Sequence, residues 1–303
     1  MEKTSNLHIA YGDKYIDWKL GKNHPTNAER ARIATNMLIK RLGDNVTVID
    51  PTVNEGDIDS LSDIHSADYV RKVLEGISDE WSGVNPVLGS TALAMFAGTA
   101  RLTERMISGE ITLGFNPQGA KHHAQYDYAS GFCVFNDMAW AAKKMALAGM
   151  RVMYIDWDAH HGDGVEALLF DTDIVACSIH EGGIYPGTGN EHFPTNAAYN
   201  WPLSHGAGTD ELRVALEGIR NIAYGYRPDV VLLATGADAH ETDPLSSLTF
   251  DYDDYSMAAS TVVDIANVHA EGRVLIGGAG GYQALTHTPR VWAQVVSEIY
   301  AGV

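Results

Sequence analysis

Two carboxylates and an imidazole alternate along one short stretch of the chain, at Asp156, Asp158 and His160. They follow the apolar residues 152–155, a run that is typical of a buried strand. Because side chains alternate faces along an extended chain, all three would point the same way if the strand continued. Adjacent carboxylates repel one another when desolvated, so the cluster makes sense chiefly around a cation. Its donors suit Zn²⁺ or a neighbouring first-row metal, and a solvated strand end is the alternative.

An open, catalytic zinc site has three protein ligands, so a third is needed beside Asp158 and His160. A further polar segment follows the apolar residues 230–234, and its ionisable residues are Asp238, His240, Glu241 and Asp243. We predict that Asp243 is the third ligand, because Pro244 would fix the chain just after it. Glu241 and His240 are the competing candidates.

Three further residues could perform acid–base and oxyanion chemistry. His122 and His123 offer imidazoles that titrate near neutrality, although adjacent histidines also occur in plain polar turns. Asp156 and Asp163 could accept hydrogen bonds from their ring nitrogens and set tautomer and basicity. Tyr282 follows a glycine-rich run, which could carry its hydroxyl close to a developing oxyanion or be only a tight turn.

Other mechanisms find little support in the sequence. The run before Tyr282 lacks the last glycine of a G-x-G-x-x-G fingerprint, because Gln283 stands there. The chain has no G-x-S-x-G elbow, P-loop or H-E-x-x-H helix. Cys133 could be a nucleophile, but a small buried thiol is the commoner case.

Strand and helix patterns alternate along the chain, which favours a mostly parallel sheet with helices on both faces. No linker or repeat divides the chain, so residues 1–303 are expected to form one domain. Ligands of such sheets bind beyond the carboxyl ends of the strands, where the polar clusters lie. The expected strands are 7–11, 45–50, 111–115, 152–155, 174–179, 230–234 and 273–276. The expected helices are 33–42, 67–74, 90–107, 136–148, 165–170, 209–226, 252–270 and 291–300, and 81–86, 116–130 and 181–202 are expected to be loops.

Composition narrows the class of partner. A formal charge of -18 disfavours nucleic acid, and it would steer cationic substrates such as lysine-bearing tails or polyamines, or serve only solubility. No apolar run is long enough to span a bilayer, so no membrane partner is expected. Only Cys133 and Cys177 are present, too few for a disulfide scaffold, which favours a cytoplasmic location.

With these residues in view, the chain resembles the histone deacetylase superfamily, closest to its bacterial branch of acetoin utilisation proteins and acetylpolyamine amidohydrolases. The resemblance covers nearly the whole chain and rests on several motifs in one order. The motifs are NPQGAKHHA (116–124), SGFCVFND (130–137), YIDWDAHHGDG (154–164), SIHE (178–181), YPGTG (185–189), GADAHETDPL (236–245) and GAGGY (278–282).

The resemblance implies an arginase/deacetylase-like three-layer fold and Zn²⁺-dependent hydrolysis of an acyl amide by metal-activated water, with Fe²⁺ or another divalent metal as an alternative. It places the metal on Asp158, His160 and Asp243. It makes His123, paired with Asp163, the principal base and acid, with His122 and Asp156 tuning the charge and Tyr282 polarising the acyl oxygen. Gly131, Phe132 and Tyr185 would line a substrate tunnel. A structural K⁺ would lie near Asp156, Asp158, His160, Ser178 and Ile179.

Three positions depart from the pattern of the superfamily. Lys121 precedes the histidine pair where small residues are usual, which would put a cation near the tunnel floor. Ala279 interrupts the glycine run, and Thr242 stands where many relatives have glycine. We expect an amidohydrolase acting on acylated lysine. An acetylpolyamine or other small-amide hydrolase is the nearest rival, and a non-catalytic metal-dependent binding protein is a rival of another class.

Overall fold

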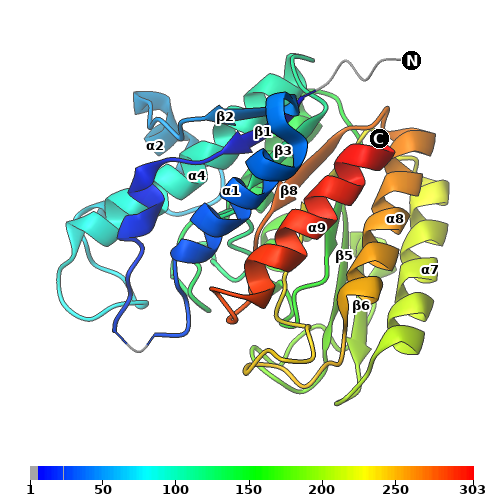
Figure 1. The fold of residues 1–303 in the computed structure, drawn as a ribbon. Coiled ribbons are helices and arrows are strands. Elements are labelled where there is room, and N and C mark those ends of the chain that lie inside the picture. Colours follow the sequence, from blue (N-terminus) through cyan, green and yellow to red (C-terminus); the bar gives the residue numbers. More distant parts are fainter. Residues whose placement is uncertain (1–5, 23) are drawn as a thin grey trace.

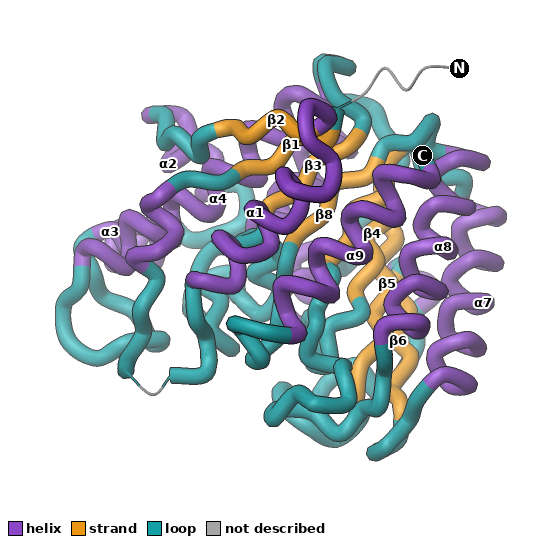
Figure 2. Tube along the Cα trace, viewed as in Figure 1, coloured by secondary structure: helices purple, strands orange, loops and turns teal. Residues whose placement is uncertain are grey.

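A computed structural model describes residues 6–22 and 24–303, and within them the strands form one eight-stranded parallel sheet (Figures 1 and 2). The spatial order is β2-β1-β3-β8-β7-β4-β5-β6. The strands are β1 (Leu7–Ala10), β2 (Val46–Ile49), β3 (Leu113–Asn116), β4 (Val152–Asp156), β5 (Val175–Glu181), β6 (Ala198–Leu203), β7 (Val230–Ala234) and β8 (Val274–Gly277).

Helices cover both faces of this sheet, which gives three layers. Figure 1 shows α1, α7, α8 and α9 side by side over one face, and α2, α4 and their neighbours lie on the other side. The helices are α1 (Glu29–Leu42), α2 (Glu55–Leu61), α3 (Ala67–Leu74), α4 (Pro86–Ile107), α5 (Asp137–Leu147), α6 (Asp163–Leu169), α7 (Thr209–Tyr226), α8 (Tyr252–His269) and α9 (His287–Gly302). Short 3₁₀ turns are η1 (Asp13–Asp17), η2 (Gly43–Asn45) and η3 (Pro194–Asn196).

Alternation along the central strands separates the two apolar layers. In β7, Val231 and Leu233 pack into the cluster under α7, α8 and α9, whereas Val230 and Leu232 pack into the cluster under α4 and α5. Both sets are fully buried. Strands buried on both faces are near-continuous apolar runs, as residues 230–234 are. The predicted parallel sheet with helices on both faces is therefore confirmed.

The structure corrects two element assignments. Residues 198–203, expected to lie in a loop, form β6, which pairs with β5. Residues 55–61 form α2, for which no helix was predicted.

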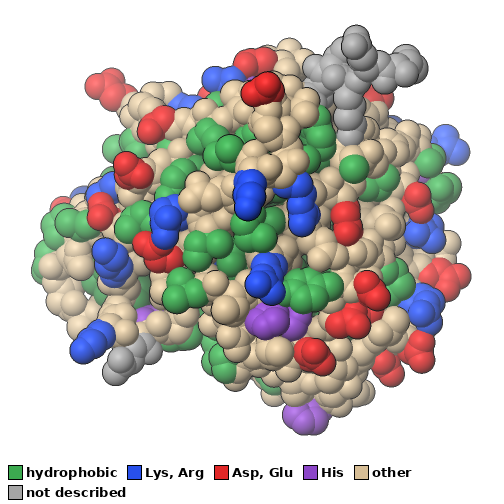
Figure 3. Space-filling model, viewed as in Figure 1, with side chains coloured by type: hydrophobic (Ala, Val, Ile, Leu, Met, Phe, Trp, Pro, Cys, Tyr) green, Lys and Arg blue, Asp and Glu red, His purple; other side chains and the backbone are tan. Residues whose placement is uncertain are grey.

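In the described part of the chain, no helix combines the length and apolarity that a membrane span requires. Figure 3 shows Lys and Arg side chains dispersed among Asp and Glu over the viewed face.

A buried histidine fixes the long loop between β3 and α5. The His65 ring lies between the Gln125 carbonyl oxygen, 2.8 Å from Nδ1, and the Asn136 N–H, which donates to Nε2 at 3.0 Å. Burial lowers the pKa of His65 to about 4, so the ring is neutral and donates through Nδ1. Asn136 in turn caps α5 through its side chain. This loop carries the histidine pair, and its end is thereby anchored to the core.

Candidate metal centre and catalytic pocket

The loops that follow β3, β4, β7 and β8 meet beyond the carboxyl ends of these strands, along the lower edge of Figure 1. The four strands are neighbours, in the order β3-β8-β7-β4. This adjacency brings together polar segments that lie far apart in the sequence. It is the position expected for a ligand site on a parallel sheet.

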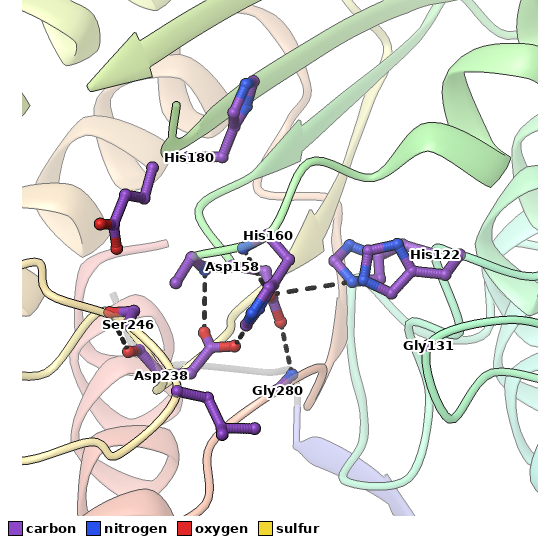
Figure 4. A network of polar contacts seen from close by, with 12 residues as sticks. His122, Gly131, Asp158, His160, His180, Asp238, Ser246 and Gly280 are labelled. Atoms are coloured by element: carbon purple, nitrogen blue, oxygen red, sulfur yellow. Dashed lines mark hydrogen bonds and ion pairs between the residues drawn. The ribbon is translucent and has the colours of Figure 1, made fainter. Parts of the chain in front are cut away.

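A compact donor cluster forms where the β4 and β7 loops touch. The donor atoms of Asp158, His160 and Asp238 all lie within 4.8 Å of one another, and all three residues are buried. Figure 4 shows the three side chains pointing toward one another. Nδ1 of His160 lies 3.2 Å from Asp158 Oδ1 and 3.0 Å from Asp238 Oδ2. One imidazole and two carboxylates in this arrangement fit a divalent first-row metal.

The third donor of the cluster is Asp238, whereas the sequence led us to Asp243. Both oxygens of Asp243 accept backbone N–H groups, from Tyr282 at 2.7 Å and Leu245 at 3.0 Å, just as both oxygens of Asp158 accept those of His160 and Gly280. The other competitors also lie elsewhere: Glu241 is exposed, and His240 Nδ1 contacts the Thr242 hydroxyl at 3.0 Å. Asp243 therefore orients the backbone of Tyr282. Burial and the charge of Asp158 raise the pKa of Asp243 to about 6, so this acid also lies beside the cluster, and its role as the third ligand stays a prediction.

Close backbone contact explains why Asp238 reaches the cluster. A Cβ added to Gly236 would lie 2.4 Å from Asp158 Cα, so the loop after β7 passes directly against Asp158. Two residues later, Asp238 accepts a hydrogen bond from the Ala159 N–H at 2.9 Å. The chain then turns at residues 238–242, which takes Asp243 toward Tyr282. Gly236 was the signal in the sequence, because a glycine at this position lets the loop after β7 approach Asp158 closely.

The electrostatics of the cluster also call for a cation. Burial and the neighbouring charge of Asp158 raise the pKa of Asp238 to about 7. The pKa of His160, which burial alone would lower, is raised to about 11 by its hydrogen bonds to the two acids. The protonated His160 ring supplies the positive charge between the two acids, and a divalent cation bound at its Nδ1 would take the place of that proton.

Two histidine–aspartate pairs lie beside the cluster. His122 Nδ1 is 2.7 Å from Asp156 Oδ2, which also accepts the Tyr154 hydroxyl at 2.6 Å. His123 Nδ1 is 2.7 Å from Asp163 Oδ1. Both pairings agree with those predicted. They leave the Nε2 atom of each ring free of its aspartate.

The two imidazoles have opposite pKa shifts. Burial would lower the pKa of His122, but the charges of Asp156 and Asp158 raise it to about 9. Burial and the adjacent His122 lower the pKa of His123 to about 4. The ring centroids are 4.0 Å apart, so a proton on one disfavours a proton on the other. His123 is accordingly the neutral ring, able to accept a proton, and His122 the charged one.

An outer pocket of about 440 Å³ opens over these groups. It is lined by His123, Gly131, Phe132, His160, Ile184, Tyr185, Leu245 and Tyr282. The three predicted tunnel residues are thus among its walls, whereas Ile184 and Leu245 were not predicted, although Leu245 ends the motif at 236–245. Tyr185 is held by a hydrogen bond with the Ser130 hydroxyl. Its ring centroid is 5.1 Å from that of His123.

Tyr282 lies at the wall of the same pocket, with its ring centroid 6.1 Å from that of Phe132. Burial and the charge of Asp238 raise its pKa well above the ordinary value, so the hydroxyl stays protonated and can donate. The Tyr282 backbone is fixed by Asp243. The phenol, the neutral imidazole and His160 of the donor cluster therefore line one space.

The remaining predicted positions have mixed outcomes. Asp156 and Ser178 are directly paired across β4 and β5, which is compatible with the predicted potassium site, and the site stays a prediction. Cys133 and Cys177 are both buried and free, and burial raises the pKa of Cys133 to about 12, which argues against a catalytic thiolate. Ala279 has φ 52°, a conformation that favours glycine.

Comparison with known proteins gives concordant results. The family profile described as "Histone deacetylase domain" matches residues 24–299. The acetoin utilization protein AcuC of Staphylococcus aureus (strain Mu50 / ATCC 700699) is 28% identical over 319 residues, which cover 97% of this chain and 82% of that protein. AcuC of Bacillus subtilis (strain 168) is 29% identical over 315 residues, covering 95% and 81%. The crystal structure of the HDA15 HD domain superposes with a TM-score of 0.85 at 24% identity, over 98% of this chain and 89% of that one.

Proposed function

Since the chain belongs to the histone deacetylase family, in its AcuC-like branch, we propose that it is a metal-dependent amidohydrolase that removes acetyl or another short acyl group from acylated lysine side chains. The observation that carries this proposal is one pocket whose walls include a neutral histidine, a protonated phenol and His160, a member of the three-donor cluster. Each is a group that amide hydrolysis needs.

Asp158 and His160 would hold the metal together with a third acid, either Asp243, the ligand predicted from the sequence, or Asp238, the third member of the donor cluster. Zn²⁺ is the first candidate, and Fe²⁺ or another divalent ion is the alternative. The ion would supply Lewis-acid polarisation of the acyl carbonyl and a lower pKa for water. The fit rests on the two adjacent buried acids, which need a positive charge between them. We retain the proposal of a structural K⁺ near Asp156, Ser178 and Ile179, together with the backbone at 158 and 160.

The protein's own groups then divide the proton transfers. His123 takes a proton from the attacking water through Nε2, because Nδ1 is bonded to Asp163. The same ring returns a proton to the leaving amine. Tyr282 donates a hydrogen bond to the oxyanion that develops on the acyl oxygen. His122, positively charged beside Asp156, keeps His123 unprotonated in the resting enzyme.

The outer pocket favours a slender chain that ends in an acylamide. Phe132 and Tyr185 supply aromatic walls, and the overall charge of -18 favours cationic substrates. Acylated lysine and acylated polyamines both have an aliphatic chain attached to the amide nitrogen. We propose acylated lysine first, in the cytoplasm, and keep the acetylpolyamine as the second substrate.

Turnover of a fluorogenic acetyl-lysine peptide tests the proposal. We expect hydrolysis that a chelator abolishes and that Zn²⁺ or Fe²⁺ restores. The same preparation is then assayed with acetylated polyamines to rank the two substrate classes. Stoichiometric metal binding without turnover of any acylamide would instead indicate a non-catalytic metal-dependent binding protein.

A further inference from the structure

A smaller inner cavity of about 20 Å³ lies behind the outer pocket. The two spaces share four wall residues, His123, Gly131, Phe132 and Tyr282. The inner cavity also touches Asp158 of the donor cluster, so it begins where the reacting carbonyl would lie. If the amine chain occupies the outer pocket, the far end of the acyl group must point into the inner cavity.

Lys121 lines this inner cavity and has no partner. Its side chain is only 7% exposed. In the described part of the chain, no acceptor forms a hydrogen bond or ion pair with Lys121 Nζ. The adjacent acid, Asp137, is already engaged by the backbone N–H groups of Ala120 and Lys121 and by the Thr99 hydroxyl. A buried ammonium without an acceptor is costly, because it has lost its water and the charges of Asp137 and Asp158 compensate only part of that loss.

A second buried cation shares the cavity. Arg30 is 4% exposed, donates through Nη1 to the Gly281 carbonyl oxygen at 2.8 Å and lies 5.0 Å from the Trp292 ring centroid. Its buried Nε has no hydrogen-bond partner. Burial is the main cause that lowers the pKa of Lys121 to about 8, and the charge of Arg30 also lowers it. Two cations with unused donors therefore face a space that would accept an anion.

We propose that this inner cavity binds a carboxylate at the end of the acyl group, so that the enzyme hydrolyses short dicarboxylic acyl amides such as malonyl- or succinyl-lysine. This inference rests on the proposed amidohydrolase function and names its substrate class. In the reaction, water supplies the oxygen that bonds to the acyl carbon, the C–N bond breaks, and the amine gains a proton. The products are the free amine and the dicarboxylate.

The cavity volume sets the length of the acyl group. About 20 Å³ is room for roughly one water molecule, so the flexible Lys121 side chain must shift as a carboxylate enters. A malonyl group has one methylene between the carbonyl and the carboxylate, whereas a succinyl group has two. We therefore expect malonyl to be preferred over succinyl.

The test compares substrates that differ only in charge. Isovaleryl-lysine is the neutral isostere of malonyl-lysine, because a dimethyl-substituted carbon replaces the carboxylate. The ratio of kcat/KM for the malonyl peptide to that for the isovaleryl peptide is measured in wild type, Lys121→Met and Lys121→Arg, each with its metal content determined. We expect the ratio to fall about 10- to 100-fold in Lys121→Met, as for loss of a charge-assisted hydrogen bond, and to stay within about threefold in Lys121→Arg.

A role of Lys121 as a fixed counter-charge for Asp158 would lower both rates together and leave the ratio unchanged, which overturns the proposal. A wild-type preference for isovaleryl would overturn it as well. Acetyl-lysine turnover in the same preparations separates this from the proposed function, because an enzyme that hydrolyses acetyl but not malonyl refutes only the acyl assignment. If no acylamide is hydrolysed, binding of free malonate to wild type and Lys121→Met is compared by calorimetry. Equal affinity would then refute the carboxylate site directly.

Discussion

Separate replacement of Asp238 and Asp243 by asparagine tests which of them is the third metal ligand. Asp238 belongs to the donor cluster of the structure, and Asp243 is the ligand predicted from the sequence. The two substitutions are matched, because each removes one negative charge from a buried acid of the same loop. Asp238 contributes a donor atom within 4.8 Å of the other two donors. Asp243 instead accepts the backbone N–H groups of Tyr282 and Leu245. We expect Asp238→Asn to lose the metal and Asp243→Asn to keep it.

The size of each effect follows from the roles of the two side chains. Structural zinc sites bind with about 10–16 kcal/mol over four ligands, which is about 2.5–4 kcal/mol per ligand and a factor of about 10²–10³ in affinity. Residues that act behind the ligands change affinity or activity by about 10–100-fold. Asp243→Asn should therefore reduce turnover through a displaced Tyr282 while metal affinity changes little.

The assay is metal content after dialysis, followed by competition with a chromophoric chelator to obtain the dissociation constant of Zn²⁺. Circular dichroism of both variants serves as the control for folding. A metal-free Asp243→Asn beside a fully loaded Asp238→Asn would refute the ligand assignment. Equal loss of metal in both variants would mean that the two acids do not have separate roles, and would also contradict the prediction.

Three other perturbations have defined outcomes. Tyr282→Phe should lower kcat by about 10²–10³ with unchanged metal content, because one oxyanion donor is removed, and steady-state kinetics with metal analysis checks this. Gly131→Ala should abolish most activity, because the new Cβ would lie 2.3 Å from the ring of His123. Gly149→Ala is the control: this glycine also has a positive φ, but a Cβ there meets nothing within 4 Å, so the substitution should cost only about 1–2 kcal/mol of stability and no activity. His65→Gln should flatten the pH dependence of the free energy of unfolding. The pKa of His65 is about 4 in the native protein and 6.5 in the unfolded chain, so the wild type loses up to about 3 kcal/mol of stability as the pH falls from 6.5 to 4. Urea titrations of the metal-free protein at pH 4–7 measure this loss. Parallel pH profiles of the wild type and His65→Gln would contradict that reasoning.

The parts of the fold that the sequence predicted are those in which burial alone determines the pattern. β7 is apolar along its whole length, and β4 is apolar up to Ile155, because both faces of each strand are covered. β6 was missed because it is an edge strand with half-exposed positions and contains Pro202. α2 was missed because it has only seven residues, of which two are buried. Neither element carries the periodicity on which a sequence-based prediction depends.

The same division applies to the site. Asp158 and His160 were identified because a period of two along an extended segment places them on one side. Donor chemistry predicted that Asp156 and Asp163 would bond the two imidazoles, the family resemblance implied which acid pairs with which ring, and both pairs are found at 2.7 Å. The third donor could not be chosen in this way, because Asp238 and Asp243 lie in one irregular loop whose path depends on tertiary contact.

Glycines make this tertiary contact possible, because at Gly236 and Gly280 the backbone of the loop lies directly against the acids of the donor cluster. A Cβ on Gly280 would lie 2.3 Å from Asp238 Oδ2 and 2.5 Å from Asp158 Oδ2, so only glycine lets the β8 loop touch both donors. The Gly280 N–H donates to Asp158 Oδ2 at 2.6 Å and thereby orients one ligand. Ala279 breaks the run one residue earlier, at φ 52° and a strain of about 1–2 kcal/mol, and is one of the residues that line the inner cavity. Its place in that wall, beside Lys121, means that this departure from the family pattern bears on the acyl group and leaves the metal donors intact.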